Sequence, residues 1–293
     1  MKFVEFPHED TFDYELKRVC KNCGHEFNGR YCNRCGEEVL VPHERSLPLL
    51  FRRTFGKVPI LDNKFTRTLR FMVTRTGFVA LSYIQGRRIP FFDPLAMFLV
   101  VNLLYFLFST NHSYNSSLRT HMHFQLHNEA ATQMVERHLL EEEIDLEDFT
   151  LKYDLHAGSV AKIMLICLVV ILAVPFWIAN YASGLFFRDH LIVSMEFCTV
   201  TVLLNNLLIP WLWIAFNTII NSEPVDIDSL FNELYPALIL GAISLALFYA
   251  IETRVYGLSR RRALFISLSL LAGLFISLHL YYGVVFFVSM WTI

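Results

Sequence analysis

Long apolar stretches run through this chain and restrict it to folds that a lipid bilayer can hold. Each is close to the roughly 20 residues that a helix needs to cross a hydrocarbon core. In chain order they are Phe92–Ser109, Val160–Asn180, Leu191–Ile214, Tyr235–Ile251 and Ala263–Met290. Because 54 % of the 293 residues are hydrophobic, an ordinary soluble domain is excluded. We predict a mainly α, polytopic membrane helix bundle of about five transmembrane helices.

The charged residues between these stretches alternate in sign. The segment 45–88 contains ten Lys or Arg residues and one acidic residue, whereas the connection 110–159 contains three basic and nine acidic residues. Lys and Arg are retained on the cytosolic side of a membrane. The first 17 residues lack the apolar core of a secretory signal. We therefore expect a cytosolic N-terminus, five crossings and an extracytoplasmic C-terminus.

Two Cys-x-x-Cys pairs stand near the N-terminus, Cys20 with Cys23 and Cys32 with Cys35. Four thiolates at this spacing satisfy a tetrahedral Zn²⁺ ion and leave no open coordination position. A glycine follows each pair, where a tight turn needs a positive φ. The pattern predicts a structural zinc ribbon over residues 1–44. Disulfides and an iron–sulfur centre are the alternatives.

The basic residues before the first stretch accompany a helical hydrophobic period. Residues 64–83 place apolar side chains on one face, away from Arg70 and Arg75, and Arg87 and Arg88 follow. We predict that residues 45–90 form an amphipathic segment on the membrane surface, where these arginines bind anionic headgroups. Ordinary basic flanking of a span is the alternative. Residues 91–293 then form the transmembrane domain, with an acidic, histidine-bearing extracytoplasmic loop at 110–159.

The sequence Tyr83-Ile84-Gln85-Gly86-Arg87-Arg88, followed by Pro94 and an apolar run to Leu107, resembles a bacterial membrane family known as domain of unknown function 3667. Asp189-His190-Leu191 at the start of the third stretch resembles the same family. The chain departs from the family's pattern at Thr76, where a proline is expected, and at Glu196, where a second histidine is expected. The resemblance implies a protein of the bacterial inner membrane with a cytosolic zinc ribbon, and it implies no reaction.

Polar residues inside the apolar stretches are costly and often mark a functional site. Glu196 is the main candidate, since it lies in the third stretch beyond His190. We hypothesise an intramembrane polar site formed by Asn102, His190, Glu196 and Asn206 that binds a cation or a proton. The alternative is that Glu196 reaches water or bonds a neighbouring helix. In the outer loop, the i and i+4 spacing of His123 and His127 could suit a metal, but a solvated amphipathic helix with the histidines on its polar face is the favoured interpretation.

No nucleotide-binding loop, nucleophile elbow or His-Glu-x-x-His motif is present, so no catalytic residue is predicted. Acidic residues beside the ribbon also disfavour nucleic acid as its ligand. The sequence favours a non-enzymatic scaffold or sensor whose ribbon engages a cytosolic protein partner. The alternatives are a small transporter or channel that uses the third stretch, and a membrane-embedded enzyme that modifies lipids.

Overall fold

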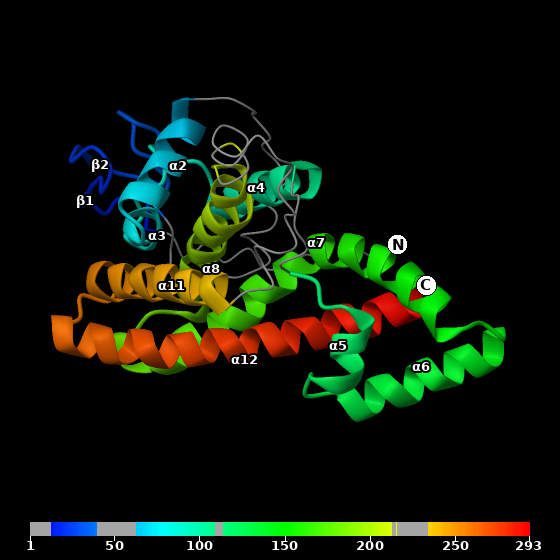
Figure 1. Ribbon diagram of the computed structural model, residues 1–293. Coiled ribbons are helices and arrows are strands. Elements are labelled where there is room, and N and C mark those ends of the chain that lie inside the picture. The colour runs from blue at the N-terminus through cyan, green and yellow to red at the C-terminus, as the bar shows by residue number, and fades with distance from the viewer. Residues whose placement is uncertain (1–12, 40–62, 109–113, 213–214, 216–233) are drawn as a thin grey trace, which may run out of the picture.

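The computed structural model describes residues 13–39, 63–108, 114–212, 215 and 234–293. The chain is mainly helical within these ranges, as the sequence predicts (Figure 1). The elements before the long helices are β1 (Arg18–Val19), β2 (Glu26–Phe27), α2 (Asn63–Thr74), α3 (Phe78–Ile84), α4 (Pro94–Phe108), α5 (Leu118–His123) and α6 (Asn128–Glu142). After them come α7 (Leu146–Ala179), η2 (Tyr181–Ser183), α8 (Phe187–Thr201), η3 (Val202–Leu208), α11 (Leu234–Arg254) and α12 (Arg260–Thr292).

Three helical stretches of the described residues are long and apolar enough to cross a membrane. They are α7, the continuous stretch Phe187–Leu212 that contains α8 and η3, and α12. The prediction of five spans is therefore not confirmed. Helix α4 has only 15 described residues, and the side chains of α11 are described from Leu240 onward.

Helices α7 and α12 lie side by side along most of their length (Figure 1). With 34 and 33 residues, each is about 50 Å long at 1.5 Å per residue, which exceeds a hydrocarbon core of about 30 Å. Their close approach depends on Gly273, because a Cβ atom there would lie 2.9 Å from Cβ of Pro175. Helix α7 also begins at Leu146, within the region predicted as the outer loop.

The helix that starts at Phe187 widens into the π-helical segment η3 before Pro210. A proline inside a helix has no N–H to donate, and its ring clashes with the carbonyl four residues earlier, which here belongs to Asn206. A local change to i→i+5 hydrogen bonding relieves both effects, and such segments are frequent at functional sites. Pro210 therefore explains why the irregular turn falls on Asn205 and Asn206.

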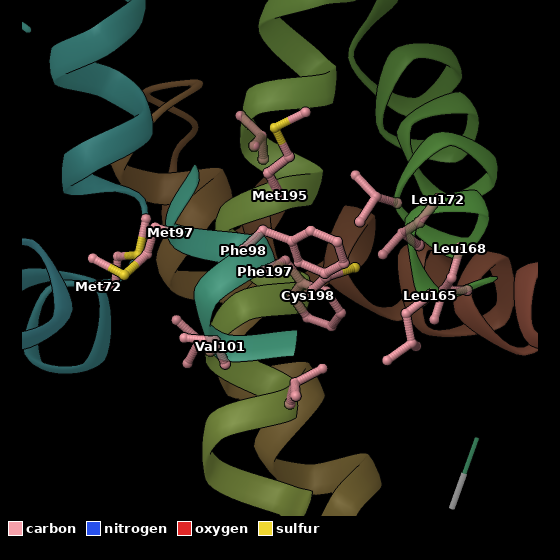
Figure 2. Close-up of a cluster of buried hydrophobic side chains, with 14 of the residues drawn as sticks. Met72, Met97, Phe98, Val101, Leu165, Leu168, Leu172, Met195, Phe197 and Cys198 are labelled. Carbon is pink, nitrogen blue, oxygen red and sulfur yellow. The ribbon is translucent and has the colours of Figure 1, made fainter. Parts of the chain in front are cut away.

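The main hydrophobic core lies where α4, α7 and α8 meet (Figure 2). Leu165, Leu168 and Leu172 of α7 lie opposite Phe197 and Cys198 of α8. Met72 of α2 joins the same core together with α3, so the segment predicted to lie on the membrane surface packs against the helices. Residues 45–62 of that segment lie outside the described residues.

Candidate metal centre and its contacts with the helices

Four cysteines converge at the tip of the N-terminal ribbon, as the sequence predicts. The Sγ atoms of Cys20, Cys23, Cys32 and Cys35 all lie within 4.8 Å of one another. In each pair the first cysteine's carbonyl accepts a 2.8 Å hydrogen bond from the N–H of the following glycine, Gly24 or Gly36. Gly24 has φ +72° and Gly36 has φ +73°, a backbone conformation that residues with a Cβ rarely adopt. The two turns are therefore equivalent and present their thiols to one point.

The sulfur positions fit a tetrahedral metal ion. Sγ of Cys20 lies 3.5 Å from Sγ of Cys35, and Sγ of Cys23 lies 3.7 Å from Sγ of Cys32. Four sulfurs at about 2.3 Å from Zn²⁺ would be about 3.8 Å apart, whereas a disulfide requires about 2.05 Å. The described cysteines are accordingly free thiols, and these four could hold a metal ion.

The thiols of Cys20 and Cys35 differ in pKa. A hydrogen bond with the side chain of Asn22 lowers the pKa of Cys35 to about 6, whereas burial raises the pKa of Cys20 to about 12. A bound cation stabilises the thiolate form of each ligand and releases the corresponding proton. Metal binding at this site therefore becomes tighter as the pH rises.

The ribbon is joined to the helical part through Glu37, two residues after the last cysteine. Its carboxylate oxygen Oε2 accepts hydrogen bonds from the backbone N–H groups of Arg88 and Ile89, at 3.3 and 3.2 Å. The carbonyl of Glu37 also accepts from the N–H of Cys32 at 2.8 Å. Glu37 is only 6 % exposed. One residue thus contacts both the metal knuckle and the turn that follows α3.

The other end of α3 is held by Glu196, which is fully buried. Its carboxylate accepts hydrogen bonds from the N–H of Gly77 at 2.7 Å and the N–H of Ala80 at 2.6 Å. A carboxylate is favoured at a helix N-terminus, where N–H groups lack partners within the helix. Gly77 has φ +87°, and a Cβ atom on it would lie 3.1 Å from Cγ2 of Val255. Glu196 therefore bonds a neighbouring helix, the alternative that the sequence left open.

Thr76 and Glu196 share Arg254 as a neighbour. Thr76 precedes Gly77, and its carbonyl accepts a hydrogen bond from the guanidinium group of Arg254. The same guanidinium interacts electrostatically with Glu196. The arrangement joins the start of α3 to both α8 and the end of α11.

His190 lies in a separate polar cluster at the start of α8. Its Nδ1 is 2.8 Å from the hydroxyl of Tyr256, and the two rings stack. The neighbouring Asp189 accepts from the N–H of Phe186 at 3.1 Å and thereby caps the helix. Near this cluster, the buried Glu252 accepts a hydrogen bond from Asn180 at 3.0 Å.

The remaining members of the hypothesised polar site have other surroundings. Asn102 donates to the carbonyl of Lys162 at 3.0 Å, which ties α4 to α7. Asn206 lies on η3, more than two turns beyond Glu196. The structure therefore places the four side chains of the hypothesised site with different partners.

The arginines assigned to lipid headgroups are partly available at the surface. Arg70, Arg75 and Arg87 are exposed, whereas Arg88 is half-buried beneath the ribbon. Arg75 also stacks over the ring of Phe71, at 5.8 Å from its centre.

The sequence did not predict the hydrogen bond between the backbone of Arg88 and the side chain of Glu37. The position of Glu37 directly after a metal knuckle could have indicated a docking contact.

In the outer region, the structure pairs His127 with His121 and not with His123. Nδ1 of His121 lies 3.0 Å from Nε2 of His127, and both rings pack against Phe286 of α12. Burial lowers the pKa of His121 to about 4. His123 lies on the other side of the short helix α5, so the predicted pair at i and i+4 is not formed.

Residues 62–106 match the model of a family described as Protein of unknown function (DUF3667). The chain carries a DUF3667 segment. This confirms the family that the Gln85-Gly86-Arg87 sequence indicated, and the match covers α2, α3 and most of α4. The DUF3667 match includes neither the ribbon that carries the four cysteines nor Glu196. Glu37 of the ribbon and Glu196 of α8 contact the matched segment at opposite ends of α3. No curated protein and no solved structure matches the chain.

Proposed function

We propose that this protein is a membrane-embedded sensor or scaffold in which a zinc ribbon controls the position of the DUF3667 segment. The observation that carries the proposal is the contact of Glu37 with the N–H groups of Arg88 and Ile89. Because the carbonyl of Glu37 is bonded to the metal knuckle, the position of its carboxylate depends on the folded ribbon. Loss of the metal would remove this contact.

Helix α3 extends the coupling into the bundle. It has only seven residues, too few to be stable alone, so its position depends on its two end contacts. Glu37 holds the turn after it, and Glu196 of α8 holds its start. A change in the ribbon can therefore reach a membrane-compatible helix through one short rigid element. We assign Zn²⁺ as the structural ion because four thiolates in a closed tetrahedral set are typical of it.

The exposed face of the ribbon supports a protein partner. Four large hydrophobic side chains there are at least half exposed: Tyr14, Leu16, Val19 and Tyr31. Exposed large apolar side chains on so short a ribbon are a feature of interaction surfaces. We propose that a cytosolic protein binds this ribbon face, which consists of these four residues. The acidic residues Glu26, Glu37 and Glu38 of the ribbon disfavour nucleic acid, which requires a basic surface.

The topology completes the proposal. We propose five crossings of a bacterial inner membrane, with α4 and α11 added to the three confirmed candidates. The basic segment before α4 then faces the cytosol, and its exposed residues Arg70, Arg75 and Arg87 contact anionic headgroups. The acidic residues of α6 and the start of α7 face outward. A reporter fused after Ile293 should therefore be extracytoplasmic.

Photo-crosslinking in cells tests the partner. A photoreactive amino acid replaces Val19 on the ribbon face in the full-length chain, and the same amino acid replaces the exposed Leu264 of α12 as a matched control. The proposal expects one protein adduct from position 19, none from position 264, and loss of the adduct when Cys20 and Cys23 become Ser. An adduct that persists without the cysteines, or no protein adduct at position 19, would contradict it.

A further inference from the structure

A cavity of about 440 Å³ lies between α7, α8, η3, α11 and α12, beyond Glu196 along the helical stretch Phe187–Leu212. Its size falls within the range of known small-molecule sites, about 300–1,000 Å³. Leu168 and Leu172 of α7 form one wall, and Phe197 and Cys198 of α8 form another, as Figure 2 shows. Leu271 and Leu274 of α12 line a further side.

The polar groups of this cavity are few and uncharged. No charged side chain of the described residues lines it. Thr201 of α8 and Ser244 of α11 contribute hydroxyl groups, and Asn205 of η3 contributes an amide group. A ligand that carried a full charge into this space would leave that charge unpaired, which is strongly unfavourable.

Asn205 supplies the specific evidence for a ligand. Its side chain is 5 % exposed, yet its carbonyl oxygen Oδ1 has no hydrogen-bond partner among the described residues. Buried acceptors are nearly always paired, so an orphaned one in a cavity wall requires a donor from elsewhere. The residue also lies on the π-helical segment, a type of irregularity that is frequent at binding sites. A hydroxyl group of a ligand would meet this requirement.

The wall that α12 contributes to the cavity includes a side chain that is also exposed on the surface of the helix. Phe275 lines the cavity and is 63 % exposed, and its neighbour Ile276 is 56 % exposed. Large exposed apolar side chains on a membrane-compatible helix contact acyl chains in a bilayer. A hydrophobic ligand could therefore enter sideways from the membrane without crossing water.

We infer that this cavity binds an uncharged single-chain lipid whose hydroxyl group donates a hydrogen bond to Oδ1 of Asn205. The alkyl chain lies against the leucines of α7 and α12, and the head reaches the polar side chains of η3 and α11. The inference does not depend on the ribbon or its partner. It concerns a second site, which neither Glu196 nor α3 lines.

Photolabelling tests the inference on the full-length protein in phosphatidylcholine nanodiscs. The probe is hexadecanol with a diazirine in mid-chain, and labelled peptides are located by mass spectrometry. We expect label on the cavity wall of α7 and α11, displaced by unlabelled hexadecanol and at least about tenfold less effectively by palmitate, whose carboxylate is charged.

Two variants that fill the cavity and one matched control decide the result. Gly241 lines the cavity, and a Cβ atom there meets no atom within 4 Å, so Gly241→Phe should fill the space without a backbone clash. Leu274→Trp fills it from α12. Ala242→Phe adds the same ring to the exposed face of α11. We expect displaceable labelling to fall about tenfold in both filled variants and to stay unchanged in the control.

Asn205→Leu separates recognition of the head from that of the chain. Loss of one hydrogen bond should raise the Kd for hexadecanol about fivefold to tenfold and leave binding of a diazirine-bearing hexadecane unchanged. Labelling confined to exposed residues of α12, or displaceable labelling that survives both filled variants, would overturn the inference. An equal loss of alcohol and alkane binding in Asn205→Leu would refute the role of Oδ1.

Discussion

Removal of the Glu196 carboxylate should release the start of α3. The carboxylate accepts two short hydrogen bonds, from Gly77 and Ala80, at a site with no exposure to solvent. Glu196→Ala leaves both N–H groups unpaired, and at about 1–3 kcal/mol for each buried donor the local stability falls by about 4 kcal/mol. Glu196→Gln keeps one acceptor oxygen and turns an NH₂ group toward the other donor, so it costs about 2 kcal/mol.

Hydrogen exchange measured by mass spectrometry reports this loss directly, because the opening of α3 exposes its own amides. A tenfold change in exchange rate corresponds to about 1.4 kcal/mol, so peptides that cover residues 76–86 should exchange about 30-fold faster in Glu196→Gln and about 1,000-fold faster in Glu196→Ala. Thr201→Val serves as the control, since the Thr201 hydroxyl bonds only within its own helix, to Phe197 at 2.7 Å. Unchanged exchange of α3 in Glu196→Ala would refute the assignment of Glu196 as its cap.

Three further predictions follow from contacts elsewhere in the chain. Elemental analysis should find one zinc ion per chain and none in Cys20→Ser, and a full zinc content in the variant would contradict the four-cysteine site. Removal of the metal with a chelator should accelerate hydrogen exchange of the backbone amides of residues 86–89. Gly273→Val should overpack against Pro175 and reduce the free energy of unfolding by about 1–3 kcal/mol, which lowers the thermal midpoint. Ala272→Val, on the exposed face of the same helix, should leave the midpoint unchanged. Burial lowers the pKa of His121 to about 4 from the ordinary 6.5, so the folded state is most stable above pH 6.5 and loses stability as the pH falls toward 4. The thermal midpoint plotted against pH should be flatter over that interval in His121→Asn. An unchanged slope would contradict this.

The helical class and the metal cluster were predictable because they depend on local rules. The apolar runs require helices in any bilayer, and the spacing of Cys20, Cys23, Cys32 and Cys35 defines two knuckles without reference to the rest of the chain. The same holds for the glycine at position 77, which interrupts the amphipathic helix as its sequence indicates. The number of spans is a different matter, since three described helices are long and apolar enough to cross a membrane and the crossings by α4 and α11 are part of the proposal.

Only the tertiary structure decided what the polar residues do. Glu196 is 119 residues from Gly77 in the chain, and no pattern in sequence indicates that a carboxylate in one helix will cap another. The pairing of His127 with His121 depends on where α12 places Phe286, not on the spacing of the histidines along one helix. The lack of a partner for Asn205 Oδ1 likewise depends on which side chains of α7, α11 and α12 surround the segment η3.

The sequence by itself determined that this chain is a helical, membrane-compatible protein with a DUF3667 segment and a four-cysteine ribbon that could hold a metal ion. Period, hydropathy and cysteine spacing are short-range properties, so they can be read along the chain. The tertiary structure alone decided that the ribbon is fixed to that segment by Glu37, and the segment to α8 by Glu196. Buried polar groups must find partners, and their partners are set by packing between distant helices rather than by neighbours in sequence.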